Sequence, residues 1–187
     1  MFVPLQRLLL RTRYTRSRAD ELSDVHGRLR HARRAQFTEE ERTLAVELRA
    51  LKSSVAEALA EVSSCSRCAL GKPTPRGVFA GGDCCSSDTP GLFADEEVLA
   101  LAAGGTTVRD LRAPTTTHAG CAFRGALGCT LTAVDRPERC VRYMCGTLRR
   151  ELGATRDRVR VEELVAELRA TMDRFVALES ARVDSVA

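Results

Sequence analysis

The stretch TEEERTLAVELRALKSSVAEALAEV, residues 38–62, decides the fold class of this chain. Thr38 and Glu41 have the spacing of a capping box, in which a hydroxyl starts a helix and a carboxylate three residues later returns the hydrogen bond. Apolar residues then recur at intervals of three and four, as on one face of an α-helix. They are Leu44, Leu48, Leu51, Val55, Leu59 and Val62. The pattern predicts one amphipathic helix of about 25 residues over 38–63.

A second stretch with the same periodicity covers residues 160–183. Its apolar positions are Val161, Leu164, Leu168, Met172, Phe175 and Val176. A one-sided apolar stripe must be buried against a partner surface. The two stripes therefore predict an antiparallel pair or a small bundle. Pairing of helices 38–63 and 160–183 between chains also satisfies the pattern, so a homo-oligomer or a docked protein partner is an alternative expectation.

Eight cysteines lie between these two stretches, and none lies elsewhere in the chain. They are Cys65, Cys68, Cys84, Cys85, Cys121, Cys129, Cys140 and Cys145. Thiols at this density are disulfide-bonded, metal-bound or redox-active. Arg7 interrupts the first apolar run, which rules against a signal peptide, and no stretch has the length of a membrane span. We therefore expect a cytoplasmic protein with metal-bound thiolates; a disulfide framework is the alternative.

The spacing of the cysteines indicates which kinds of metal site they can form. Cys65 and Cys68 are separated by two residues, so a tight turn can bring both sulfurs to one ion, as in half of a zinc site. Cys84 and Cys85 are adjacent, and neighbouring side chains diverge in an extended chain. The adjacent pair therefore suits two metal ions, or two irons of one cluster, better than one tetrahedral ion. We expect all eight cysteines to be ligands of zinc or iron, an iron–sulfur cluster included.

The segment between the two helices is rich in turns. Asp95-Glu-Glu97 places three acids at the start of a short helix, where the helix dipole favours negative charge, and Gly104-Gly105 closes it. Large apolar side chains are few and spread out over 65–150. A segment that buries little apolar surface needs a staple, and we expect the metal to provide it.

Pro137 has the character of a first helical residue, and we expect its helix to run to about Leu148. Cys140 and Cys145 would then stand about 140° apart in projection, which is too far for one ion to take both easily. Arg136 is expected to donate hydrogen bonds to backbone carbonyls or to offset clustered thiolate charge, so that Arg136 and Pro137 support the ligands without binding the metal.

Charge is uneven along the chain. Residues 1–36 carry nine arginines against three acidic residues, which makes a basic amino-terminal arm. A solvated helix face explains this excess more simply than contact with phosphates, and we do not expect nucleic acid as a partner. The expected divisions are a basic arm over 1–36, an amphipathic helix over 37–64, a cysteine-cluster module over 65–150, and a carboxy-terminal helix over 151–187 that packs with 37–64.

Three motifs in the second half of the cysteine segment resemble those of a known family. They are Gly120-Cys121-Ala-Phe123, Gly128-Cys129-Thr-Leu131 and Arg136-Pro137-Glu-Arg-Cys140-Val-Arg-Tyr143-Met-Cys145. With a CxxC and an adjacent CC ahead of them, they resemble the bacterial YkgJ-type cysteine-cluster proteins, a family of zinc- or iron-chelating domains. The resemblance covers roughly residues 65–145. Here fifteen residues separate Cys68 from Cys84, more than is usual in that family.

The resemblance implies that distant thiols serve one site. We therefore expect convergence in space of Cys84, Cys85, Cys121, Cys129, Cys140 and Cys145, with Cys65 and Cys68 joining them. The expected fold is mainly α, with a small cysteine-rich, metal-stabilised module flanked by long amphipathic helices. The leading hypothesis is a metal-binding protein with a structural metal, because several thiolates leave no open coordination position. The alternative is an iron–sulfur redox or methyl-transfer enzyme, since the family resembles the cysteine-rich part of flagellin lysine-N-methylase.

Overall fold

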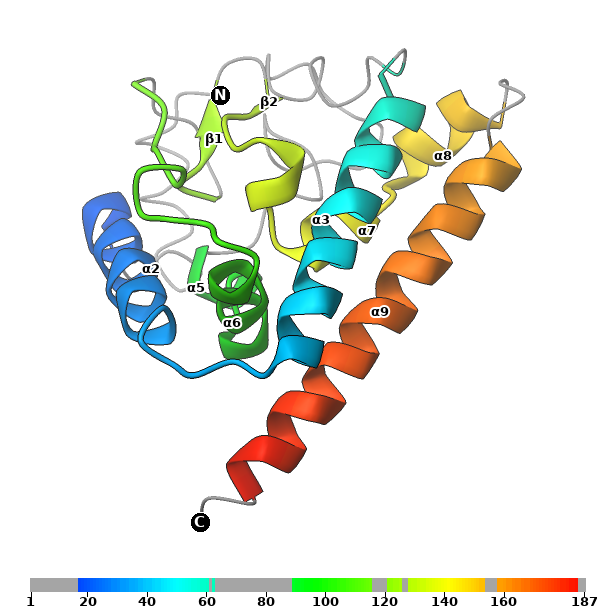
Figure 1. Ribbon diagram of the computed structural model, residues 1–187. Helices are drawn as coiled ribbons and strands as arrows, with labels where there is room; N and C mark the ends of the chain where they lie inside the picture. Colours follow the sequence, from blue (N-terminus) through cyan, green and yellow to red (C-terminus); the bar gives the residue numbers. More distant parts are fainter. Residues whose placement is uncertain are drawn as a thin grey trace.

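The computed structural model describes residues 17–60, 62, 89–115, 121–125, 128–153 and 158–184. It is mainly helical, as the sequence predicts (Figure 1). The helices are α2 (Arg18–Ala32), α3 (Glu39–Ala58), α5 (Thr89–Leu92), α6 (Asp95–Ala103), α7 (Glu138–Arg142), α8 (Gly146–Leu152) and α9 (Arg158–Asp184). Two short antiparallel strands, β1 (Arg124–Gly125) and β2 (Gly128–Cys129), and a 3-10 turn, η1 (Ala133–Asp135), complete the described elements. No helix in these ranges is long and apolar enough to cross a membrane.

Helix α3 begins with the predicted capping box. The backbone N–H of Glu41 donates to Thr38 Oγ1 at 3.1 Å, and the backbone N–H of Thr38 donates to Glu41 Oε2 at 2.6 Å. The helix ends at Ala58, not near residue 63 as predicted. Leu59 and Val62 still pack against a buried cluster after the helix has ended. The apolar spacing therefore continues beyond the helix, which is why periodicity overestimated its length.

Helices α3 and α9 form the predicted antiparallel pair within a single chain (Figure 1). Their inner faces share one buried cluster, which includes Leu44, Leu48, Leu51 and Val55 of α3 and Leu168, Met172 and Phe175 of α9. Ion pairs border this contact: Arg182 Nε lies 2.9 Å from Glu41 Oε1, and Arg174 Nη2 lies 2.9 Å from Glu47 Oε1. Both apolar stripes are thus buried against each other without a second chain.

Helix α2 differs from the sequence-based expectation. Part of the segment expected as a basic arm forms a regular helix that continues through Gly27. Ser17 caps this helix by accepting the backbone N–H of Asp20 at 3.1 Å. Val25 and Leu29 are fully buried and pack with residues of α6 and of the segment that follows. From residue 18 onward, this stretch is therefore an integral part of the core.

The cysteine segment contains a hydrophobic core of its own, which corrects the expectation that it buries little apolar surface. Phe93 and Phe123 lie at its centre, with ring centroids 5.2 Å apart. Its other large buried members are Val25, Leu29, Val98, Leu101, Leu111 and Leu131. The expectation failed because apolar residues that are spread out in sequence come together in space, and α2 adds Val25 and Leu29 from outside the segment. A metal is thus not the sole source of stability for the described part of this segment.

The short helix α6 ends where the sequence predicts. Gly104 caps it, and Gly105 follows with a φ of 89°, a backbone conformation that glycine adopts without strain. The backbone N–H of Thr106 donates to Leu101 O at 3.0 Å, as in a Schellman motif. The chain therefore reverses sharply after α6, and the Thr106 hydroxyl donates to Asp135 at 2.8 Å. That bond holds η1 against the end of α6.

The helix predicted from Pro137 to about Leu148 is two helices. α7 ends at Arg142, and Tyr143 adopts an extended ψ of 118°. Cys145 is the N-cap of α8, and its Sγ accepts the backbone N–H of Leu148 at 3.4 Å. A side chain that can cap a new helix competes with continuation of the old one. Cys140 and Cys145 therefore lie on different elements, and the rotation predicted between them does not apply.

Candidate functional site

Cys121 lies in a buried polar environment at the start of the hairpin. Its side chain belongs to the core around Phe93 and is 6% exposed. The hydroxyl oxygen of Thr89 lies 4.0 Å from Cys121 Sγ. That hydroxyl donates to Glu21 Oε2 at 2.7 Å and accepts the backbone N–H of Ala122 at 2.8 Å. A hydroxyl has one proton to donate, and that of Thr89 is donated to Glu21. The atom of Thr89 that faces the Cys121 sulfur is therefore its oxygen.

Arg124 is the first residue of β1, three positions after Cys121, and is only 2% exposed. Its Nε and Nη2 atoms are buried and have no hydrogen-bond partner among the described residues. Arg124 stands directly opposite Cys129 in the antiparallel register. Opposite residues share a face of such a ribbon, with Cβ atoms about 4.5–5.5 Å apart. The hairpin therefore carries a buried positive charge on the face that holds the Cys129 thiol.

Cys140 lies on α7, near a buried lysine of α3. Lys52 is 2% exposed, and its Nζ donates to Arg136 O at 2.7 Å. Burial lowers the pKa of Lys52 to about 8, while the negative charges of Glu97 and of the Cys140 thiolate oppose this shift. A cation that stands near a thiol favours its thiolate form. The surroundings of Cys129 and of Cys140 thus each include one buried cation.

Glu97 fixes the amino end of α7. Its carboxylate accepts the backbone N–H of Glu138 at 2.7 Å and that of Arg139 at 3.0 Å. Burial raises the pKa of Glu97, although these two hydrogen bonds act in the opposite direction. The sequence suggested that Glu97 serves the start of its own helix. Its buried carboxylate instead caps another helix, the one that carries Cys140.

The Arg-Pro motif agrees with the sequence-based expectation at Arg136, whereas Pro137 precedes the first helical residue by one position. Pro137 is the N-cap of α7, and Arg136 Nε donates to Leu131 O at 3.0 Å. Arg136 therefore ties the chain that leaves β2 to the start of α7. Its part in offsetting thiolate charge stays a prediction. Arg124 and Lys52, which sequence reasoning overlooked, are the more deeply buried cations; the only signal in the sequence was the position of Arg124 three residues after Cys121.

Half of the predicted ligands fall within the described residues. Cys65, Cys68, Cys84 and Cys85 lie outside them, and the predicted convergence with these four stays a prediction. Cys121 and Cys129 share the core around Phe93, whereas Cys145 packs in a separate cluster with Leu148 and Leu152. Within the described ranges, no three His, Cys, Asp or Glu side chains gather as metal ligands would. A metal centre in this protein therefore needs thiols from beyond the described ranges.

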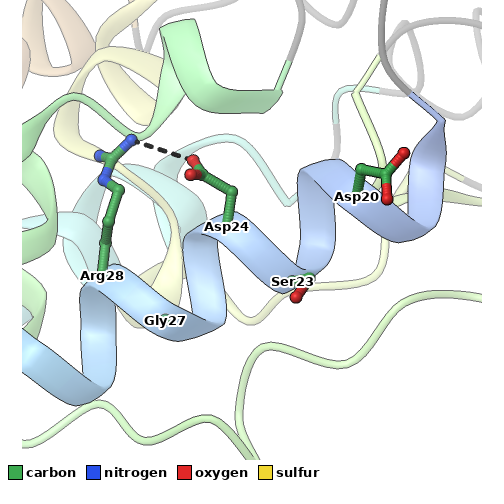
Figure 2. A pocket seen from close by; sticks show the side chains of 5 residues that line it. All are labelled: Asp20, Ser23, Asp24, Gly27 and Arg28. Atoms are coloured by element: carbon green, nitrogen blue, oxygen red, sulfur yellow. Dashed lines mark ion pairs between the residues drawn. The ribbon is translucent and has the colours of Figure 1, made fainter.

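One open surface pocket runs along α2 (Figure 2). It is lined by Asp20, Ser23, Asp24, Gly27 and Arg28. Figure 2 shows Asp24 and Arg28 pointing toward one another, with 3.6 Å between Asp24 Oδ2 and Arg28 Nη1. Arg28 Nε also lies 3.2 Å from Asp95 Oδ1. The pair of Arg28 with Asp95 joins α2 to α6.

No family model, curated protein or solved structure matches this chain. The resemblance to YkgJ-type proteins therefore depends on the cysteine motifs alone. The functional argument that follows rests on the chemistry of this chain's own residues.

Proposed function

We propose that this chain is a cytoplasmic metal-binding protein whose clustered cysteines bind zinc or iron as thiolates, with the metal in a structural role. The observation that carries the proposal is the contact between Thr89 and Cys121, 4.0 Å from oxygen to sulfur. Cys85 precedes Thr89 by four residues, and four residues span at most about 14 Å. The contact thus supports an approach of the Cys84-Cys85 pair to the thiol of Cys121.

A second contact supports the same idea for the first cysteine pair. Val62 packs in the cluster that contains Met144 and Cys145. Cys65 follows Val62 by three residues, so the covalent chain keeps it within about 11 Å of that position. Figure 1 shows the hairpin, the carboxyl end of α3 and α8 at one end of the molecule. This arrangement of elements supports a common site for thiols that are far apart in sequence.

The donor set favours zinc or iron over hard cations. Thiolates are soft ligands that select zinc, Cu(I) or iron–sulfur clusters, whereas magnesium and calcium prefer oxygen. Eight thiols suffice to close the coordination sphere of two tetrahedral ions or of one cluster and a further ion. A closed sphere leaves no position for water or substrate, which favours a structural role. The cytoplasmic location that we propose would keep these thiols reduced and available to metal.

The helical pair serves as the scaffold in this proposal. Because α3 and α9 bury their inner stripes against each other, self-association or docking of a protein partner would use their outer surfaces. Val46 on α3 and Val159 on α9 are 63% and 64% exposed. Sedimentation velocity of the protein and of a Val46→Glu variant tests this part. A monomer at all concentrations would contradict self-association.

Metal analysis of anaerobically purified protein tests the main proposal. We expect zinc or iron bound in a stoichiometric amount, colourless with zinc and brown with an iron–sulfur cluster. Cys121→Ser and Cys129→Ser should each lower the bound metal, whereas Ser53→Ala on α3 should leave it unchanged. Thiol titration in denaturant is the measurement that can contradict the proposal. A metal-free protein whose thiols are paired as disulfides would exclude the proposal and favour the disulfide framework.

A further inference from the structure

The outer face of α2 carries charges of opposite sign in its two halves. The inner face of the helix is buried, since Val25 and Leu29 turn into the core. Residues three and four positions apart share one face of a helix, and an exposed or partly exposed stripe follows that spacing. In chain order it consists of Asp20, Ser23, Asp24, Gly27, Arg30, His31 and Arg34. The amino half of this stripe is therefore acidic, and the carboxyl half is basic.

The charges near the two ends of the stripe are not neutralised within the described part of the chain. Asp20 accepts a hydrogen bond from the uncharged hydroxyl of Ser17 at 2.6 Å. Neither Asp20 nor Arg30 nor Arg34 forms an ion pair with another described residue. The arginines of α9 differ, because several of them pair with carboxylates of α3 or of α9 itself. The ends of the stripe thus present charge to a partner from outside the chain.

Gly27 lies at the middle of the stripe, where the fold of one chain does not require a glycine. Its φ is not positive, and an added Cβ would meet no atom within 4 Å among the described residues. Glycine inside a helix costs about 0.5–1 kcal/mol relative to alanine. Ser23 and Gly27 leave an open hollow of about 450 Å³ along this face (Figure 2). Close approach of another backbone is a role that glycine serves.

We propose that α2 is the contact surface of a symmetric dimer, in which the α2 helices of two copies of this chain lie antiparallel and meet at Gly27. A twofold contact is isologous, so both copies present the same patch. Asp20 and Arg34 each lie seven positions from Gly27. Asp20 of one copy is therefore level with Arg34 of the other, and Asp24 is similarly level with Arg30 and His31. In Figure 1, α2 lies at an outer edge of the molecule, with α5 and α6 on its inner side.

The charge pattern favours a second copy over a nucleic acid or an acidic peptide. A polyanion that followed the basic half of the stripe along α2 would also meet Asp20 and Asp24, which repel it. An antiparallel second copy meets both halves with the opposite charge. The stripe is polar throughout, so the contact should weaken as salt screens it. This inference rests on the proposed self-association and assigns it to α2, apart from the outer surfaces of α3 and α9.

Charge exchange between Asp20 and Arg34 tests the antiparallel contact. Asp20→Arg and Arg34→Glu each bring like charges together in the dimer, and each should weaken association about tenfold or more. An equal mixture of the two variants should recover association, because every altered residue then faces the opposite charge. The double variant should recover it for the same reason. Dissociation constants are measured by sedimentation equilibrium of the full chain under reducing conditions, at about 0.01 M salt, where the Debye length is about 30 Å.

Two further variants separate the contact from effects on folding and on net charge. Gly27→Gln places a longer side chain in open space, so it should keep the fold intact and still weaken association by blocking the approach of the second helix. Arg150→Glu on α8, also exposed, changes the net charge as Arg34→Glu does. It should leave the dissociation constant within twofold of that of the unmodified protein. Circular dichroism checks that each variant is folded.

The outcomes distinguish the α2 contact from self-association in general. If the unmodified protein is a monomer at low salt, both fail. If it self-associates and Val46→Glu weakens the association while the Asp20 and Arg34 variants do not, the contact lies on α3 and the inference about α2 is wrong. If folded single variants associate weakly but neither the mixture nor the double variant recovers, the antiparallel pairing is wrong. If a charge variant does not fold, unchanged association of Gly27→Gln overturns the inference. A monomer that binds polyglutamate through Arg30 and Arg34 would assign the surface to an acidic partner instead.

Discussion

The carboxylate of Glu97 accepts the backbone N–H of Glu138 at 2.7 Å and thereby caps a helix that begins 41 positions later in the chain. Pro137 supplies no donor at that helix start, so the carboxylate serves the N–H groups of Glu138 and Arg139. The amino end of a helix attracts negative charge. This contact orients the element that carries Cys140 with respect to α6.

Removal of the Glu97 carboxylate should destabilise the fold. Glu97→Ala leaves two backbone donors of α7 without their acceptor and removes a counter-charge near Lys52. We expect a loss of about 1–3 kcal/mol in the free energy of unfolding, measured by urea titration. Glu96→Ala is the matched control, because its half-exposed ion pair with Arg139 contributes little. Equal effects of the two substitutions would contradict the cap.

The ion pair of Glu41 with Arg182 predicts a pH dependence. Burial raises the pKa of Glu41, but hydrogen bonds from Arg182 and Thr38 outweigh it and hold the pKa below 4.5. The folded state thus favours the carboxylate form of Glu41. The contribution of this carboxylate to the free energy of unfolding is fully present above pH 4.5, and it is lost as the pH falls through the lower pKa that Glu41 has in the folded state. The difference in unfolding free energy between the unmodified protein and Glu41→Gln should shrink on acidification. Glu39→Gln, at a mostly exposed position, should show no such trend.

The aromatic pair tests whether the cysteine segment has a core that does not depend on metal. Phe123 is fully buried against Phe93. Phe123→Ala should lower the free energy of unfolding by about 3–5 kcal/mol, in metal-free protein as well as in protein as purified. Val46→Ala, at an exposed position, should have almost no effect. An effect of Phe123→Ala that vanished after metal removal would mean that the metal builds this core.

Metal removal should act locally. Structural zinc contributes about 10–16 kcal/mol of apparent binding free energy in favourable peptides, so its loss should raise the rate at which protease cleaves the cysteine segment, while the core around Phe93 retains partial protection. Helices α3 and α9 should keep most of their circular dichroism, because they bury their stripes against each other. Limited proteolysis with and without chelator makes the comparison. Full resistance of 121–145 after verified metal removal would show that metal does not maintain this region.

Patterns in the sequence predicted those structural features that depend on one helix or on two helices with matching apolar faces. The spacing of Thr38 and Glu41 predicted a capping box whose two hydrogen bonds are formed. Gly104-Gly105 predicted the end of α6, because few other residues adopt the backbone conformation found at Gly105. The two apolar stripes predicted the pairing of α3 with α9, since each stripe needs a surface to cover it. These features depend on neighbours in sequence or on complementary periodicity.

Tertiary structure decided the features that depend on distant partners. Nothing local shows that Arg124 is buried, that Glu97 caps α7, or that α2 completes the core around Phe93. The break between α7 and α8 likewise depends on competition at Cys145, whose sulfur caps the second helix. By itself, the sequence determined the helical class, the antiparallel scaffold and the concentration of thiols, because periodicity and composition are written along one chain. Only the tertiary structure decided which charges are buried beside those thiols, because the cost of burying a charge depends on every element that excludes water from it.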